Sequence, residues 1–286
     1  MTRALSLAAL TALELSPPEL VSTAAAAGYT HVGLRLIAAT PTEPRHAMIG
    51  DTPMVRETRA RLDATGLEAL DVEIFRLKPD TDVARDAQGI VETGARLGAK
   101  HLLVAGNDPD EARLTDNFAA LCDLAMRYGI AAHLEFIPWT DAKDLAQAAR
   151  IVERAGKANG GILVDAFHLS RSRSRIDDIA RLPPSRFRYA QLCDVPAAIP
   201  PTMDAILAEA RGERRFPGEG ELDLVALVRA LPRGVPLSLE VPTLELAKSV
   251  PALDRARRAL AGARRVLAQA EGRDATQPAG APTIQR

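Results

Sequence analysis

Four short apolar segments of the chain each contain one polar side chain that could supply an oxygen ligand. The residues are Glu135 in H-L-E-F-I-P, Asp165 in L-V-D-A-F-H, Gln191 in Y-A-Q-L-C-D and Glu240 in S-L-E-V-P. An ionisable group inside an apolar segment is costly unless it is paired or bound to a metal. Three carboxylates and one amide oxygen suit a divalent cation, Mn²⁺ or Mg²⁺ first, with Co²⁺ or Zn²⁺ as alternatives. The pattern therefore predicts a divalent metal site.

Each of these polar residues, taken singly, has a plainer interpretation. A carboxylate at the end of a strand is more often a helix cap or a loop anchor, and Asp194, before Val-Pro, fits that description. Cys193 is expected to be a small core residue, since no histidine is arranged to activate it. His133 is either a support for Glu135 or a hydrogen-bonded core residue. The recurrence of a polar group on four successive segments is what favours metal binding.

The polar residues belong to a regular alternation of apolar, strand-like segments and amphipathic, helical segments. Strands are expected at residues 4–10, 31–36, 68–75, 101–106, 131–138, 161–167, 188–194 and 236–242. Their spacing of about 30 residues matches a βαβ unit, and eight such units close a barrel. We therefore predict an α/β protein with a single (β/α)8 TIM barrel at residues 1–271 and a disordered C-terminal tail at 272–286. An open, doubly wound sheet is the alternative, but no Gly-rich phosphate loop follows the first strand.

Two long connections interrupt the alternation, at residues 37–50 and from 195 to about 235. Long loops inside a compact domain are usually functional, and barrel enzymes keep their sites at the carboxyl ends of the strands. The second connection carries Arg211, Arg214 and Arg215, one of which is expected to contact the substrate, with Arg211 and Arg215 as the candidates.

Two further polar residues lie in apolar strands of the first half, Arg35 in G-L-R and Glu73 in D-V-E. They are either substrate-binding residues or a structural ion pair that crosses the barrel. The sequence favours the substrate side slightly.

Charge and composition exclude several classes of protein. The chain has 286 residues, 36 Lys and Arg against 37 Asp and Glu, a net charge of −1 and 3% aromatic residues. A protein that binds nucleic acid or an anionic membrane electrostatically is not expected to have this balance. Two cysteines make no disulfide framework. The first segment lacks a convincing leader cleavage region and no apolar run approaches about 18 residues, so a cytoplasmic location without a membrane span is expected.

The metal-ligand pattern resembles that of the xylose-isomerase-like TIM barrels, over roughly residues 4 to 270. That family's metal ligands are Glu on strand five, Asp of a D-x-x-H motif on strand six, His or Gln on strand seven and Glu on strand eight. Glu135, Asp165, Gln191 and Glu240 match these positions, and His168 completes the D-x-x-H motif. Glutamine on strand seven resembles the hydroxypyruvate-isomerase-like branch. The segment R-G-E-R-R-F-P-G-E-G-E-L-D is similar to the family's R-x-x-P-G-x-G-x-x-D, which supplies an arginine near the substrate.

The resemblance implies a metal-dependent isomerase or epimerase of a keto-sugar or small hydroxy-keto acid. Glu135, Glu240 or both would transfer a proton through a metal-held enediolate, and His168 would hydrogen-bond a substrate oxygen. The alternative is a dehydratase of a keto-sugar, keto-cyclitol or dehydroshikimate-like substrate, which begins with the same proton abstraction. Five histidines and the neutral charge disfavour the endonuclease branch, and the intact ligand set disfavours a non-catalytic barrel. The resemblance is compatible with a homo-oligomer that acts on a small carbohydrate-like molecule.

Overall fold

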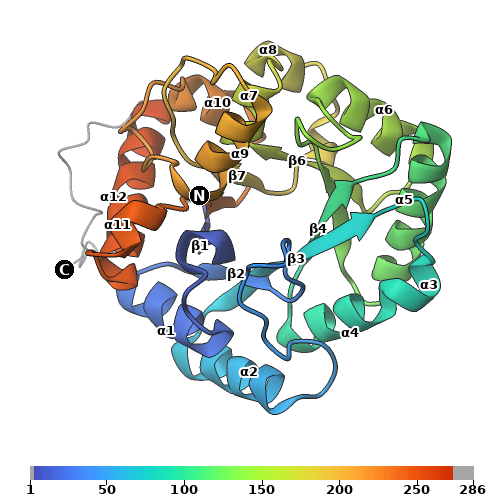
Figure 1. The fold of residues 1–286 in the computed structure, drawn as a ribbon, viewed down its shortest axis with the longest axis horizontal. Coiled ribbons are helices and arrows are strands. Elements are labelled where there is room, and N and C mark those ends of the chain that lie inside the picture. The colour runs from blue at the N-terminus through green and yellow to red at the C-terminus, as the bar shows by residue number, and fades with distance from the viewer. Residues whose placement is uncertain (1–2, 273–286) are drawn as a thin grey trace, which may run out of the picture.

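Eight parallel strands close into a barrel in the computed structural model, which describes residues 3–272 (Figure 1). The strands are β1 (Leu5–Leu7), β2 (His31–Arg35), β3 (Glu68–Leu77), β4 (His101–Gly106), β5 (Ala131–Glu135), β6 (Gly160–Asp165), β7 (Ala190–Leu192) and β8 (Leu237–Leu239). Each strand pairs with the next in sequence, and β8 pairs with β1. The predicted (β/α)8 barrel is confirmed.

Helices connect successive strands and surround the barrel (Figure 1). The α-helices are α1 (Pro17–Ala27), α2 (Pro53–Thr65), α3 (Val83–Asp86), α4 (Gln88–Leu97), α5 (Glu111–Met126), α6 (Leu145–Ala155), α7 (Ala166–Arg171), α8 (Ile176–Ile179), α9 (Met203–Gly212), α10 (Leu224–Ala230), α11 (Leu244–Ala247) and α12 (Ala252–Ala270); the 3₁₀ turns are η1 (Ala9–Ala12) and η2 (Pro184–Arg186). Their ends follow local chemistry. Ser16 and Glu19 form a capping box at the start of α1, and Gly28 ends that helix with a φ of 93°, where a side chain would be strained.

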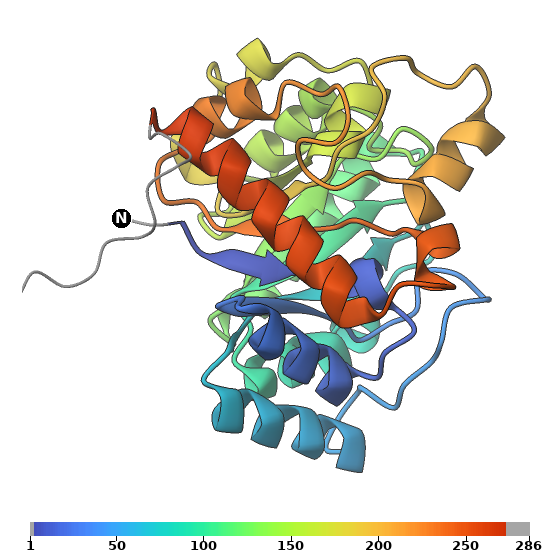
Figure 2. The same cartoon turned by 90° about the vertical axis from the view of Figure 1, so that its left-hand side faces the viewer.

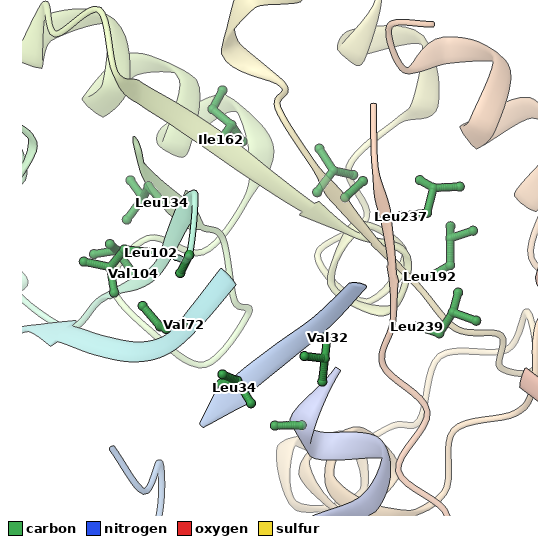
Figure 3. Close-up of a cluster of buried hydrophobic side chains, with 14 of the residues drawn as sticks. Val32, Leu34, Val72, Leu102, Val104, Leu134, Ile162, Leu192, Leu237 and Leu239 are labelled. Carbon is green, nitrogen blue, oxygen red and sulfur yellow. The ribbon is translucent and has the colours of Figure 1, made fainter. Parts of the chain in front are cut away.

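Apolar side chains on alternate strand positions fill the layer between the barrel and its helices. Figure 3 shows several of them, such as Val32, Leu102 and Leu134. A smaller cluster, which includes Leu103, Leu163 and Tyr189, lies inside the barrel itself. Because strand residues alternate between these two layers, the inward positions near the strand ends are the ones that can build a site.

Several strands end earlier than the sequence predicts. The predicted strand over 131–138 stops at Glu135, since the Ile137 amide donates to the Ala142 carbonyl instead of a neighbouring strand. The predicted strand over 188–194 is reduced to Ala190–Leu192. Asp194 instead forms an antiparallel bridge with Arg215, because the long loop folds back over the strand end. Residues 273–286 of the predicted tail lie outside the described residues. None of the helices within residues 3–272 is long and apolar enough to cross a membrane.

The two long connections extend from the same end of the barrel. Figure 2 shows the blue loop that follows β2 and the orange helix α9 on one side of the molecule, opposite the N-terminal end of β1. This side holds the carboxyl ends of the strands, and we call it the mouth. The positions predicted to carry chemistry therefore face the two irregular segments.

Candidate active site

The four predicted metal ligands lie at the mouth, on adjacent strands. Glu135 and Asp165 are the last residues of β5 and β6, Gln191 lies in β7, and Glu240 follows β8 directly. Asp165 is paired with Gln191 in the sheet register, and Gln191 with Ser238. All four residues are at most 4% exposed. The Gln191 amide Nε2 donates to Glu240 Oε1 at 3.1 Å, so strands seven and eight are joined at the site.

A buried arginine supplies the positive charge among these carboxylates. Arg214 Nη1 lies 3.0 Å from Asp165 Oδ2 and 3.0 Å from Glu240 Oε2. Its Nε donates to the Ala210 carbonyl, and its guanidinium lies over the Phe167 ring, 4.7 Å from the centroid. The arginine is thus fixed by α9, by an aromatic face and by two carboxylates, an arrangement that balances part of the buried negative charge.

Burial and the repulsion between neighbouring carboxylates raise the pKa values of the two glutamates of the site. Burial raises the pKa of Glu240 to about 7, although Arg214 opposes the rise. The pKa of Glu135 is raised well above its usual value, first by burial and then by the charges of Glu240 and Asp165. Burial also lowers the pKa of His168 to about 3, so this imidazole is neutral at physiological pH. A carboxyl group whose pKa lies near neutrality can both accept and return a proton, as acid–base catalysis requires.

The donor set at the mouth has the chemistry that a hard divalent cation prefers. Three carboxylates and the Gln191 side chain lie at this end of the barrel, and Gln191 Oε1 is a buried oxygen without a hydrogen-bond partner among the described residues. Within residues 3–272, no group of three or more His, Cys, Asp or Glu side chains is arranged to hold a metal ion in this conformation. The Arg214 guanidinium stands between Asp165 and Glu240 instead. The donor types fit a cation, and we expect its binding to require that the guanidinium move away from both carboxylates.

His168 belongs to the same site. Its Nε2 is 3.7 Å from Glu135 Oε1, and its backbone amide donates to Asp165 Oδ1 at 3.0 Å. The D-x-x-H spacing therefore has a local reason: the aspartate caps helix α7, and the histidine stands in its first turn. Trp139 packs against the His168 ring at 5.1 Å, a neighbour that the sequence analysis missed. Its position just after strand five was the available signal.

Arg35 and Glu73 form an ion pair. Arg35 Nε lies 3.0 Å from Glu73 Oε1, and Arg35 Nη1 lies 2.9 Å from Glu43 Oε2. Of the two interpretations left open by the sequence, the ion pair is the one observed, and it joins the neighbouring strands β2 and β3 rather than crossing the barrel. Contact of either residue with a substrate stays a prediction.

The three candidate arginines of the second long connection differ in position. Arg214 is buried at the carboxylates, whereas Arg211 and Arg215 are exposed and form no ion pair with the residues that the structure describes. A substrate role for Arg211 and Arg215 stays a prediction. Arg76, which is not among the residues predicted from the sequence, is a half-buried arginine of β3 whose Nη1 donates to Asn107 Oδ1 at 2.9 Å. An arginine inside the apolar run E-I-F-R-L was the signal.

Asp194 and His133 have the structural roles that were their plainer interpretation, a loop anchor and a hydrogen-bonded core residue. Asp194 accepts hydrogen bonds from the backbone amides of Val195, Gly218 and Leu222, and so anchors the loop that carries Arg214. His133 is fully buried and its Nε2 lies 3.0 Å from His101 Nδ1, below the site. These contacts explain why both residues are polar without a catalytic role.

Comparisons with known proteins agree with this architecture. The family model described as xylose isomerase-like TIM barrel matches residues 21–266. A 3-dehydroshikimate dehydratase of Pseudomonas aeruginosa is 32% identical over 155 residues, which are 51% of this chain and 24% of that protein. An inosose isomerase of Bacillus subtilis is 25% identical over 165 residues, 54% of this chain and 57% of that protein. The matches thus span about a quarter to somewhat more than half of the length of these curated relatives.

A solved structure shares the fold across nearly the whole chain. The IolI protein, crystallised with a bound zinc atom, superposes with a TM-score of 0.74 at 20% identity, over 93% of this chain and 98% of that one. At that identity the likeness concerns the fold. The family model, in contrast, covers most of the sequence. The chain therefore belongs to the xylose isomerase-like TIM barrel family.

Proposed function

We propose that this protein is a divalent-metal-dependent isomerase or epimerase of a small polyhydroxy ketone, acting by proton transfer at the carbon beside the carbonyl. The observation that supports this most is that Glu135, Asp165, Gln191 and Glu240 lie at one end of the barrel, and that burial raises the pKa values of the two glutamates. In a purely structural ion-pair network, each buried carboxylate has a cationic partner. Among the described residues, Glu135 has none except His168, whose imidazole is neutral.

The chemistry divides between a cation and two glutamates. A divalent cation, Mn²⁺ or Mg²⁺ by the donor set, would be held by Glu135, Asp165, Gln191 and Glu240 and would polarise the substrate carbonyl, which acidifies the adjacent C–H bond. Glu240, with a pKa of about 7, or Glu135 would accept that proton and return it at the neighbouring position or on the opposite face.

His168 would hold the substrate in place for this transfer. Because its imidazole is neutral, it would hydrogen-bond a substrate hydroxyl or carbonyl without adding charge to the site. The buried setting of the carboxylates keeps bulk water away from the proton in transit.

The second candidate is a dehydratase, and a specific observation favours it. The dehydratase relative is 32% identical to this chain, against 25% for the inosose isomerase. Both names denote cyclic polyhydroxy ketones as substrates. After the same proton abstraction, loss of a β-hydroxyl in place of reprotonation gives an enone. The two reactions share every residue named above and diverge only after the first step.

One experiment separates the two candidates. The protein, loaded with Mn²⁺, is incubated in D₂O with cyclic and linear polyhydroxy ketones, and the products are followed by mass spectrometry and ultraviolet absorbance. Deuterium incorporation with unchanged composition indicates isomerisation or epimerisation, and loss of water with enone absorbance indicates dehydration. No exchange with any ketone would contradict the proposal.

Variants of the two glutamates test the proton-transfer role. Glu135→Gln and Glu240→Gln are expected to lower kcat by at least about a hundredfold, the lower end of what a positioned acid or base contributes. Glu153→Gln, an exposed change of the same kind on α6, is the matched control and should leave the rate unchanged. Rates near wild type in both site variants would remove the glutamates from the reaction.

A further inference from the structure

A pocket of about 550 Å³ opens at the mouth, between the loop after β2 and the end of β3. Its volume lies within the range of small-molecule sites. Ile74, one of its lining residues, also belongs to the apolar cluster inside the barrel, and Trp139, which packs on His168, contacts the same cluster. The pocket and the candidate active site therefore border the same apolar cluster inside the barrel.

The lining of this pocket is basic. It includes Arg45, Arg76, Lys78 and Arg85 against two carboxylates, those of Asp80 and Asp86. One carboxylate is already neutralised, because Arg85 Nε lies 2.6 Å from Asp86 Oδ1. The remaining basic side chains outnumber the remaining acidic one, so the pocket has a positive potential that favours an anion.

Arg76 is the member of this set that lies deepest. It is half-buried, and its guanidinium makes a neutral contact, the hydrogen bond from Nη1 to Asn107 Oδ1. Among residues 3–272, Glu135 and Glu43 act on its guanidinium electrostatically, and neither forms an ion pair with it. Burial lowers the pKa of Arg76, whereas the charge of Glu135 raises it, so the guanidinium lies within electrostatic range of the carboxylate site.

A partly desolvated guanidinium without a carboxylate partner is costly, and the cost is offset when a ligand supplies the anion. The paired arginines of the mouth provide the contrast. Arg35 and Arg214 each contact two carboxylates, which already balance their positive charge. Arg211 repels Arg76 electrostatically from α9, which adds positive charge on the same side.

We propose, resting on the proposed function, that the substrate carries an anionic group, a carboxylate or a phosphate, which binds Arg76 in this pocket while its ketone faces Glu135 and Glu240. Arg45 and Lys78, both exposed, line the outer part of the pocket and complete its positive charge. The protein thereby selects a polyhydroxy ketone acid or phosphate over a neutral sugar of the same size.

Calorimetric titration of the whole protein with matched probes tests this selection without relying on turnover. Quinate and its methyl ester share the same polyhydroxy cyclohexane ring and differ only in the free carboxylate, while fructose 6-phosphate and fructose differ only in the phosphate. Each pair is titrated in chelator and again with Mn²⁺. We expect the anionic member of at least one pair to bind about tenfold more tightly or better, as a charge-assisted hydrogen bond supplies. The preferred pair identifies carboxylate or phosphate as the group.

Variants then locate the effect. Arg76→Gln should remove most of the preference for the anionic probe, Arg76→Lys should keep part of it, and the neutral probe should bind as before. Arg127→Gln, an exposed change of equal charge at the end of α5, is the control. Equal affinity for both members of each pair, no binding of any probe, or a preference that survives in Arg76→Gln would overturn the proposal.

The outcome is separable from that of the proposed reaction. If no ketone is turned over but the Arg76-dependent preference is present, the reaction is wrong and the anion pocket stands. If a neutral ketone is turned over well and no anion preference exists, the pocket assignment is wrong and the reaction stands.

Discussion

Replacement of Arg214 by methionine provides the sharpest test of how the site is held together. The guanidinium faces Asp165 and Glu240 at 3.0 Å each, and all three side chains are at most 6% exposed. Removing one partner of a buried ion pair typically costs about 3–5 kcal/mol, because an uncompensated charge stays behind. We expect a loss of that order in the free energy of unfolding of Arg214→Met at pH 8 in chelator.

The loss in the free energy of unfolding should be smaller at lower pH, because Glu240 is protonated there. Its folded-state pKa of about 7 is above the ordinary value of 4.5, so the folded state binds a proton that the unfolded state releases. The stability associated with that proton is complete below pH 4.5 and is lost as the pH rises through 7. Without Arg214, which lowers the pKa of Glu240, the loss extends to higher pH. The variant and the wild type should therefore differ less at pH 6 than at pH 8.

A divalent cation should rescue the variant, since it can take the place of the missing charge. At a concentration a hundred times its dissociation constant, a ligand specific for the folded state adds about 2.7 kcal/mol. The gain should be larger in Arg214→Met than in the wild type, where the guanidinium has to leave both carboxylates first. Urea unfolding at the two pH values, with chelator or Mn²⁺, measures each quantity.

The control for this experiment is Arg257→Met, which removes an exposed arginine of α12 and should change stability by no more than about 0.5 kcal/mol. If Arg214→Met is as stable as the wild type at pH 8 in chelator, the ion-pair argument fails. A gain from Mn²⁺ that is equal in both proteins would mean that Arg214 and the cation do not compete.

Two further predictions concern packing and pH. Gly262→Ala, whose Cβ would meet the Pro217 carbonyl oxygen at 2.3 Å, should cost about 1–3 kcal/mol in urea unfolding by pushing the Arg214 loop outward, whereas the exposed change Ala261→Ser should cost little. Burial lowers the pKa of His101 from 6.5 to about 4, so the stability it contributes above pH 6.5 should be lost as the pH falls towards 4, by up to about 3 kcal/mol, and His101→Gln should flatten that dependence in thermal unfolding. If the melting temperature of His101→Gln depends on pH as that of the wild type does, other groups cause the loss of stability in acid.

The sequence was sufficient for the residues whose position depends only on strand periodicity. Glu135, Asp165, Gln191 and Glu240 each lie on an inward position at the carboxyl end of a strand, and parallel closure of the barrel brings such positions together whatever the loops do. The alternation of inward and outward residues along each strand, and the order of the strands, can both be inferred from the sequence.

The sequence was insufficient where position depends on how a loop returns to the barrel. Three arginines within five residues are equivalent by composition, and only the end of α9 at Gly212, followed by the bridge between Asp194 and Arg215, points Arg214 inward. Likewise, the pairing of Arg35 with Glu73 depends on the register between β2 and β3, which shifts by a bulge after Val32. A register shift of this kind does not change the pattern of apolar and polar residues, so it cannot be predicted from the sequence.

The charge balance of the mouth explains why one carboxyl group is available for chemistry. Asp165 and Glu240 share Arg214, whose guanidinium is held between them, and its charge opposes the burial that raises the pKa of Glu240. Glu135 has no ion-pair partner among the described residues other than a His168 that is itself neutral, and burial and its acidic neighbours therefore keep its pKa high. A cation that enters would favour the ionised form of Glu135 and would compete with Arg214 for the other two carboxylates. Binding of a cation, ionisation of Glu135 and release of Arg214 from the carboxylates are therefore coupled, and a change in any one of them changes the other two.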